Sequence, residues 1–156
     1  MAIHIATLKG GIYLATFMYM IDFILYLWQL PQNIVGLLVI LFTRAKKSNL
    51  YNCYVAPDKC FGVTLGNYII FGSDDVTMFD FEFSIKHEQG HQIQSRRLGL
   101  LYLILVGIPS ITCNIYNTLF HKTWTNKQIL EWYYSLPWEK NANKLSSIEW
   151  KDFYKY

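Results

Sequence analysis

The chain has 156 residues, of which 53% are hydrophobic and 16% are charged, and its formal net charge is +3. This length suits a single domain, but the charged fraction is well below the roughly 25% that is usual for soluble domains. The positive charge is small and dispersed and forms no basic stripe with interleaved aromatic residues, so nucleic-acid binding is not predicted. The excess of apolar residues indicates apolar surface beyond a soluble core.

The first apolar region covers residues 10–43, in which Asp22 is the only charged residue. Its stretch Ile12–Leu30 has about the length that spans a bilayer. Leu30-Pro31 breaks the helical pattern, so Ile34–Thr43 either continues a kinked helix or returns as a re-entrant arm. The run is too long for a secretory signal and lacks a cleavage site, which favours a retained anchor. Asp22 is either a functional acid or a residue that caps a helix break or faces protein.

Residues 51–83 are rich in Tyr, Val, Ile and Phe and are punctuated by turn residues, which predicts short strands. The best hairpin candidate is Val63–Phe71, with Gly66-Asn67 at its turn. An edge strand in this region would be able to pair with an extended peptide. Cys53 and Cys60 could form a disulfide bond, but three cysteines without a framework favour free thiols in a reducing compartment.

The next segment contains the sequence His87-Glu88-Gln89-Gly90-His91, an H-E-x-x-H motif. On a helix, residues four apart share one face, so both imidazoles can reach one metal ion while Glu88 lies beside the open coordination position. This spacing is typical of zinc hydrolases. We expect the zinc helix over residues 84–98, with Ser84 as its N-cap and Gly99 as its stop.

A second uncharged region covers residues 98–120 and is interrupted by Gly107, Pro109 and Ser110. It forms either one span or two short arms that meet at a turn, and its densest part, Leu100–Ile108, also suits a buried core element. Basic residues flank both apolar regions, which favours membrane insertion with the catalytic face in the cytoplasm. The flanking basic residues are Arg44, Lys46, Lys47, Arg96, Arg97 and Lys122.

A zinc site needs a third protein ligand, and we predict Glu139. Pro137 suits the first turn of a helix over residues 137–145, in which Glu139 and Asn143 share one face. Glu139 would bind the metal while Asn143 supports a histidine ligand. The alternative ligands downstream are His121, Glu131, Glu149 and Asp152, with His4 and the acidic residues upstream as weaker candidates.

These motifs together resemble the H-E-x-x-H plus E-x-x-x-D pattern of gluzincin zinc metallopeptidases. The resemblance implies Zn²⁺ held by His87, His91 and Glu139, with Glu88 as the general base that assists a metal-activated water. Asn143 stands where the pattern has Asp, and an amide lacks the negative charge that makes a histidine ligand more basic. Tyr133, Tyr134 and His121 are candidate donors to the oxyanion.

A second resemblance covers most of the chain. Trp28–Asn33, His87–Ser95, Leu98–Ser110 and Glu139–Asn143 are similar to segments of small uncharacterised membrane-associated proteins that carry an H-E-x-G-H helix. That group implies a membrane setting but no established activity.

We therefore expect one membrane-associated domain over residues 1–156, an α+β zincin-like minidomain with membrane-inserted apolar helices. The predicted function is a membrane zinc metallopeptidase that acts on a protein or peptide substrate. One alternative is a catalytically inactive membrane structural or interaction protein that retains the zinc site. A second alternative treats His87 and His91 as ordinary surface histidines.

Overall fold

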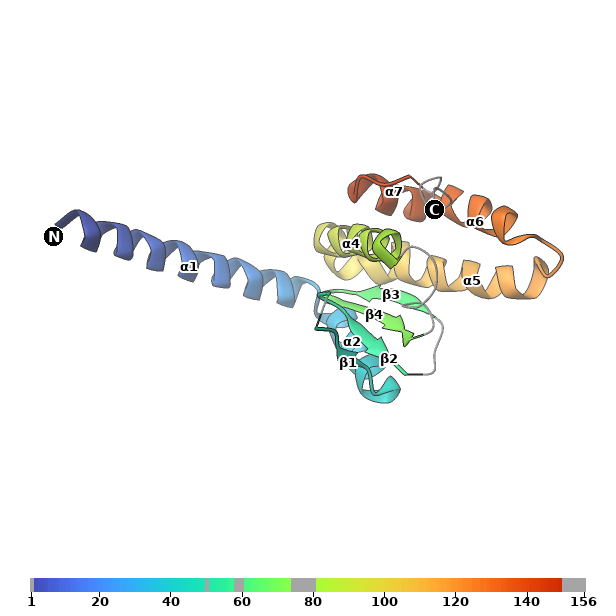
Figure 1. Cartoon of the computed structure of the whole chain (residues 1–156), viewed down its shortest axis with the longest axis horizontal. Coiled ribbons are helices and arrows are strands. Elements are labelled where there is room, and N and C mark those ends of the chain that lie inside the picture. The colour runs from blue at the N-terminus through green and yellow to red at the C-terminus, as the bar shows by residue number, and fades with distance from the viewer. Residues whose placement is uncertain (1, 50, 58–60, 74–80, 150–156) are drawn as a thin grey trace.

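A computed structural model of the chain describes residues 2–49, 51–57, 61–73 and 81–149, with side chains from residue 13 onward. The described part combines helices with one four-stranded sheet, which confirms the predicted α+β class. Figure 1 shows a long first helix that projects from a body in which the sheet and the other helices are packed.

The first apolar region forms two helices, α1 (Ala2–Trp28) and α2 (Leu30–Thr43), that meet at an angle of 82°. Pro31 occupies the first turn of α2, where its missing N–H costs no helical hydrogen bond. The predicted break is therefore confirmed. Asp22 lies inside α1 with an exposed side chain, so it does not cap the break.

The sheet contains β1 (Lys46–Lys47), β2 (Tyr54–Ala56), β3 (Gly62–Leu65) and β4 (Tyr68–Gly72) in the order β1-β2-β4-β3. Strand β2 runs parallel to β4, while β1 pairs antiparallel with β2 and β3 pairs antiparallel with β4. The predicted hairpin is confirmed, because Leu65 pairs with Tyr68 across Gly66-Asn67 and Gly66 has a φ of +65°. Strand β3 is an edge strand.

Two expectations fall partly outside the described residues. Cys60 is not described, so its pairing with Cys53 is not tested, and Cys53 itself is buried. Residues 74–80, at the end of the predicted strand-rich region, are also not described.

The sheet lies between two helices. Gly36 of α2 packs against Leu65 and Tyr68 on one face, whereas Thr64 on the other face contacts Glu88 of α4 (Phe81–Leu98). Between α4 and the sheet lies the apolar core, which is formed by Cys53, Ile69, Phe71 and Ile85 with Val55 and Phe81 against it. Helix α4 begins before Ser84, so the predicted N-cap is wrong, because Phe81 and Phe83 are packed as helical core residues.

A buried polar network fixes the bend between α1 and α2 against the end of α4. Ser95 donates to Gln29 Oε1 at 2.8 Å, and Gln32 Nε2 donates to the carbonyl of Gly99 at 2.8 Å. Gly99 has a φ of +54°, which confirms it as the stop of α4, and the Trp28 ring fills the space where a Cβ would lie. Asn33 Oδ1 accepts the N–H of Asn67, so the same bend also holds the hairpin turn.

The second apolar region is helical and continuous through the residues that were expected to interrupt it. A 3₁₀ turn, η1 (Gly99–Leu101), precedes a π-helix, η2 (Leu103–Gly107), which continues into α5 (Ile108–Phe120). The alternative with a turn at Gly107, Pro109 and Ser110 is wrong, because the wider π-helix makes room for the proline ring within one helix. The buried-core alternative for Leu100–Ile108 is also wrong, since Leu100, Leu101, Ile104, Leu105 and Ile108 are all more than 50% exposed.

Helix α6 (Asn126–Ser135) starts with a capping box formed by Thr125 and Gln128. Helix α7 (Pro137–Leu145) follows directly and has the predicted bounds. It packs on the side of α4 that faces away from the sheet, so α4 lies between the sheet and α7 (Figure 1).

Candidate metal centre

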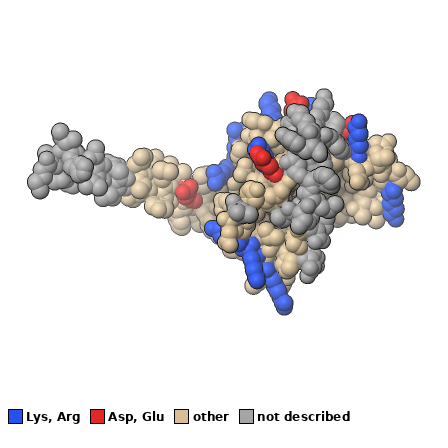
Figure 2. All heavy atoms as spheres, viewed as in Figure 1, with Lys and Arg blue, Asp and Glu red and all other residues tan. Residues whose placement is uncertain are grey.

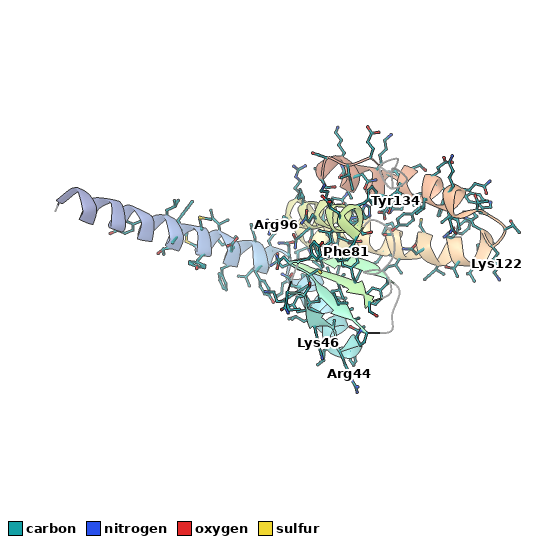
Figure 3. The ribbon with its side chains drawn as sticks, in the orientation of Figure 1. Arg44, Lys46, Phe81, Arg96, Lys122 and Tyr134 are labelled. Atoms are coloured by element: carbon teal, nitrogen blue, oxygen red, sulfur yellow. The ribbon has the colours of Figure 1, made fainter. Side chains whose placement is uncertain are left out.

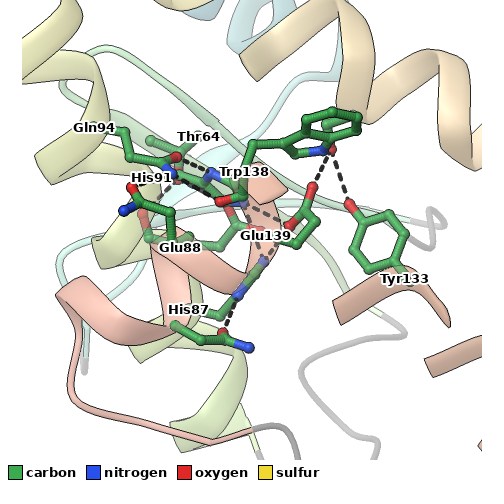
Figure 4. A network of polar contacts seen from close by, with 12 residues as sticks. Thr64, His87, Glu88, His91, Gln94, Tyr133, Trp138 and Glu139 are labelled. Atoms are coloured by element: carbon green, nitrogen blue, oxygen red, sulfur yellow. Dashed lines mark hydrogen bonds and ion pairs between the residues drawn. The ribbon is translucent and has the colours of Figure 1, made fainter. Parts of the chain in front are cut away.

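Three buried side chains from two helices converge on one point. His87 and His91 lie four residues apart on α4, and Glu139 lies in the first turn of α7, where the helix dipole favours a negative charge. The Glu139 Oε2 atom lies 3.0 Å from Nε2 of each histidine, and the two Nε2 atoms lie 3.1 Å apart. The relative exposure is 5% for each histidine and 0% for Glu139. Figure 4 shows the three side chains turned toward one another.

A glycine in the motif allows this convergence. A Cβ atom on Gly90 would overlap the carbonyl oxygen of Ala142 in α7. Because position 90 has no side chain, the backbones of α4 and α7 approach closely enough for Glu139 to reach the histidines. The close approach at Gly90 is therefore one between α4 and α7.

Both imidazoles are oriented through their other nitrogen. His87 Nδ1 lies 2.7 Å from Asn143 Oδ1, and His91 Nδ1 lies 2.8 Å from Gln94 Oε1. The Gln94 amide has only one orientation that satisfies its neighbours, since its nitrogen donates to the carbonyl of Trp138 and to Asn141 Oδ1. Amide oxygens only accept hydrogen bonds, so the Nδ1 atoms carry hydrogens and both Nε2 atoms turn toward Glu139.

This arrangement requires a positive charge at its centre, because two imidazole lone pairs and a carboxylate oxygen face one another. Burial alone would lower the pKa of His91, but the hydrogen bond and charge of Glu139 outweigh it and raise that pKa to about 9. Burial alone would raise the pKa of Glu139, but its close contacts with His87 and His91, which share a positive charge, hold that pKa well below its ordinary value. A proton between these atoms meets the requirement, and a bound metal ion would meet it in place of the proton.

The three ligand atoms fit a metal ion. In the described part of the chain, His87, His91 and Glu139 form a group whose ligand atoms all lie within 4.8 Å of one another. In a tetrahedral zinc site with bonds of about 2.0–2.1 Å, neighbouring ligand atoms lie about 3.3 Å apart. The observed separations of 3.0 to 3.1 Å need only a small widening to reach that value. The predicted metal-binding triad is therefore confirmed as a geometry, whereas the identity of the metal stays a prediction.

Glu88 lies beside this group and faces β3. Its Oε2 atom accepts a hydrogen bond from the Thr64 hydroxyl at 2.7 Å, and a Cβ on Gly62 would lie 3.2 Å from its Oε1 atom. The side chain is 7% exposed. The carboxylate is thus held at the edge strand of the sheet and does not join the three ligand atoms.

A cavity of about 240 Å³ adjoins His87 and Glu88 and lies between α4, the sheet, α5 and α6. Tyr133 and Tyr134 line it, and Tyr134 packs edge-on against the His87 ring with centroids 5.1 Å apart. Figure 3 shows Tyr134 on the side of the body where α6 and α7 lie. The remaining lining residues are Gly62, Phe71, Ser84, Asn114, Asn117, Ile129 and Leu130.

His121 lies elsewhere. Its ring stacks on Trp124 with centroids 3.6 Å apart, and its Nδ1 atom lies 3.0 Å from Asn117 Oδ1. It follows the last residue of α5 and is not among the residues that line the cavity. Of the other alternative ligands, Glu131 and Glu149 are exposed and do not join the centre, while Asp152 and the His4 side chain lie outside the described part and are not tested.

Three residues of the site were not predicted from the sequence. Ser110 of α5 donates to Glu139 Oε1 at 2.7 Å and lies 2.8 Å from the Tyr133 hydroxyl. Thr64 holds Glu88, and Gln94 of α4 holds His91. Its position three residues after His91 was the available signal, because i and i+3 residues are neighbours on a helix.

No protein-family model matches the chain, and no curated protein or solved structure shows significant similarity to it. The resemblance to gluzincins therefore rests on the motifs and on the geometry of the three ligands.

Proposed function

We propose that the chain is a membrane-associated zinc metallopeptidase. The observation that carries this proposal is the convergence of His87, His91 and Glu139 on one point, with the Glu88 carboxylate beside the same cavity. A structural zinc site has no need of a cavity or of an adjacent acceptor, because its coordination positions are filled by protein ligands. Two histidines and one carboxylate leave a coordination position open for water or substrate.

The ligand chemistry favours zinc. Imidazole nitrogen and carboxylate oxygen are common zinc ligands, and three protein ligands are typical of catalytic zinc. When bound, zinc activates water and polarises a carbonyl group as a Lewis acid. Asn143 and Gln94 orient the two imidazoles, which is the usual role of residues behind metal-binding histidines.

Glu88 is the general base of the proposed reaction. An ionised carboxylate accepts protons, and the hydrogen bond from Thr64 directs it at the edge of the cavity. After removing a proton from the attacking water, Glu88 would deliver it to the amine that leaves when the peptide bond breaks. Tyr133 and Tyr134 line the cavity, and this position supports Tyr134 more than Tyr133 as a donor to the oxyanion, because the Tyr133 hydroxyl lies 2.8 Å from Ser110 Oγ. The position of His121 gives it less support.

The substrate is proposed to bind as an extended strand along β3. The carbonyl of Phe61 accepts the N–H of Gly72, so alternate residues of β3 pair with β4. This alternation directs the N–H and C=O of Gly62 and Thr64 to the free edge, where Tyr102 donates to the Thr64 carbonyl at 3.0 Å. The backbone of Gly62 lies next to Glu88 and remains a suitable partner for a peptide backbone.

Exposed apolar helices support the membrane part of the proposal. Leu103–Phe120 is long and apolar enough to cross a bilayer, with 18 residues and a mean hydropathy of 1.5, and α1 with α2 forms a bent pair that passes the same test. Apolar side chains are exposed on all sides of α1. Among its described side chains, from residue 13 onward, this projecting helix carries no Lys or Arg (Figure 2). The flanking Arg44, Lys46 and Lys122 (Figure 3) support a cytoplasmic catalytic face.

The test separates catalysis from metal binding. In detergent-purified protein, we expect one zinc per chain and cleavage of a mixture of quenched fluorescent peptides. Glu88→Gln should keep the zinc and lose cleavage by about 10²–10⁴-fold, whereas Glu82→Gln, an exposed position on the same helix, should leave both unchanged.

The outcome also decides between the alternatives. Stoichiometric zinc without cleavage in the unmodified protein would favour an inactive structural or interaction protein. The amide of Asn143, which stands where the gluzincin pattern has Asp, is the observation that supports this alternative. Absence of zinc after metal loading would refute both proposals and leave His87 and His91 as ordinary histidines.

A further inference from the structure

The second oxygen of Glu139 has a partner that comes from the apolar helix α5. While Glu139 Oε2 faces the two imidazoles, Ser110 Oγ lies 2.7 Å from Oε1. Glu139 has no exposed surface, so water does not compete for this contact. Each carboxylate oxygen therefore has its own task, with one oxygen for the metal position and the other for Ser110.

The number of available hydrogens determines which group donates in each hydrogen bond of Ser110. An ionised carboxylate only accepts, so the single hydroxyl hydrogen of Ser110 is donated to Glu139. The contact between Ser110 and Tyr133, at 2.8 Å, must then use the hydrogen of Tyr133. Asn114 Nδ2 donates in turn to the Tyr133 oxygen at 3.4 Å, which is a long hydrogen bond. The donors thus form a chain from Tyr133 through Ser110 to Glu139.

We propose that Ser110, supported by Tyr133, is a positioning residue that keeps Glu139 a ligand through one oxygen only. This inference rests on the zinc site of the proposed function. A carboxylate can bind a metal through one or both oxygens, and the second mode would occupy the position needed for water or substrate. A hydrogen bond to Oε1 holds the carboxylate plane in place and leaves Oε2 alone directed at the metal position, which supports metal binding.

The position of Ser110 on α5 supports a dedicated role. Ser110, Asn114 and Asn117 recur at helical spacing and turn toward the site, since Ser110 contacts Glu139 and both asparagines line the cavity. The opposite face of the same helical segment is an apolar stripe that is more than 50% exposed and consists of Ile104, Ile108, Ile111, Ile115 and Leu119. Polar side chains on such an apolar helix need hydrogen-bond partners within the protein, and the partner of Ser110 is Glu139 of the metal centre.

Cobalt provides a readout that does not depend on activity. We would load the full-length protein in detergent with Co²⁺, record its visible absorption, and measure zinc affinity by chelator competition. Ser110→Ala should lower the absorption intensity, because a second carboxylate oxygen raises the coordination number, and should weaken zinc binding by about 10–100-fold. Ser110→Thr keeps the hydroxyl and should restore both signals.

Two further variants complete the experiment. Tyr133→Phe removes the supporting donor without touching Ser110 and should shift both signals in the same direction by a smaller amount. Thr112→Ala should have no effect, since Thr112 is exposed on the same helix and bonds only within it, to the Ile108 carbonyl. If Ser110→Ala does not fold, Tyr133→Phe decides the question.

The possible results are distinct. Unchanged cobalt spectra and zinc affinity in Ser110→Ala and Tyr133→Phe would overturn this inference while leaving the peptidase proposal intact. The expected spectral changes without any peptide cleavage would support the positioning role and refute the peptidase. A protein that binds neither Co²⁺ nor Zn²⁺ would refute both.

Discussion

Asn143 Oδ1 lies 2.7 Å from His87 Nδ1, with both side chains buried. This contact places an amide where the gluzincin pattern has a carboxylate. The amide oxygen can orient the imidazole as well as a carboxylate can, but it brings no charge that would make Nε2 a stronger metal ligand. His87 is therefore oriented as a metal ligand, but it lacks the negative charge that a carboxylate would place beside its Nδ1 atom.

Asn143 variants test the two contributions separately. Asn143→Ala removes orientation and should weaken zinc binding by about 10–100-fold, whereas Asn143→Asp adds charge and should strengthen it. Zinc affinity measured by chelator competition provides the comparison. Lys140→Ala, an exposed position on α7, should leave the affinity unchanged. Weaker zinc binding in Asn143→Asp would show that charge at this position does not support the ligand.

The second prediction concerns Gly90, which sets the distance between α4 and α7. A Cβ on Gly90 would overlap the Ala142 carbonyl, so Gly90→Ala should push α7 away and separate Glu139 from the histidines. We expect a loss of stability of about 1–3 kcal/mol from overpacking, together with loss of stoichiometric zinc. Thermal unfolding and zinc analysis measure the two effects.

Gly107→Ala is the matched control, because a Cβ there would lie 3.4 Å from the nearest side-chain atom, an ordinary contact. This variant should keep both zinc and stability. Stoichiometric zinc in Gly90→Ala would mean that α7 adapts, and the close approach would then not be a requirement of the site.

The parts of the site that could be predicted from sequence are those set by local spacing. His87 and His91 share a face because they are four residues apart on one helix, and Pro137 marks the start of the helix that carries Glu139 and Asn143. The hairpin at Gly66-Asn67 follows from the same kind of local rule. Such signals need no knowledge of how elements pack.

The residues that were missed make contacts between elements far apart in the chain. Ser110 and Thr64 reach Glu139 and Glu88 across 29 and 24 residues, respectively. Nothing in the local pattern distinguishes them from other hydroxyl residues. The predicted turn at Pro109 was wrong for a related reason. A proline usually breaks a helix, but the π-helix before Pro109 accommodates its ring within a continuous helix.

The metal-free protein should show a specific dependence of stability on pH. The pKa of His91 is raised from 6.5 to about 9, so its contribution is complete below pH 6.5 and is lost as the pH rises toward 9. The pKa of Glu139 is lowered from 4.5, so its contribution is present above pH 4.5 and is lost as the pH falls. Stability should therefore be greatest between these two limits.

Thermal unfolding of chelator-treated protein across this pH range measures the effect. Glu139→Gln should flatten the alkaline decline, because the charge that raises the pKa of His91 is removed. A decline of equal size in this variant would assign the effect to other groups.

The last prediction concerns α1 as the membrane anchor. Phe17 and Ile24 are 53% and 56% exposed on a helix whose described side chains include one charge, at Asp22. The unmodified protein should remain in the membrane pellet after alkaline carbonate extraction. Phe17→Lys combined with Ile24→Lys should release it, because a lysine near the centre of a membrane helix costs about 2.5–3.5 kcal/mol. Asp22→Leu should stay in the pellet. Full retention of the double-lysine variant would exclude α1 as the anchor and leave the apolar stripe of α5 as the membrane contact.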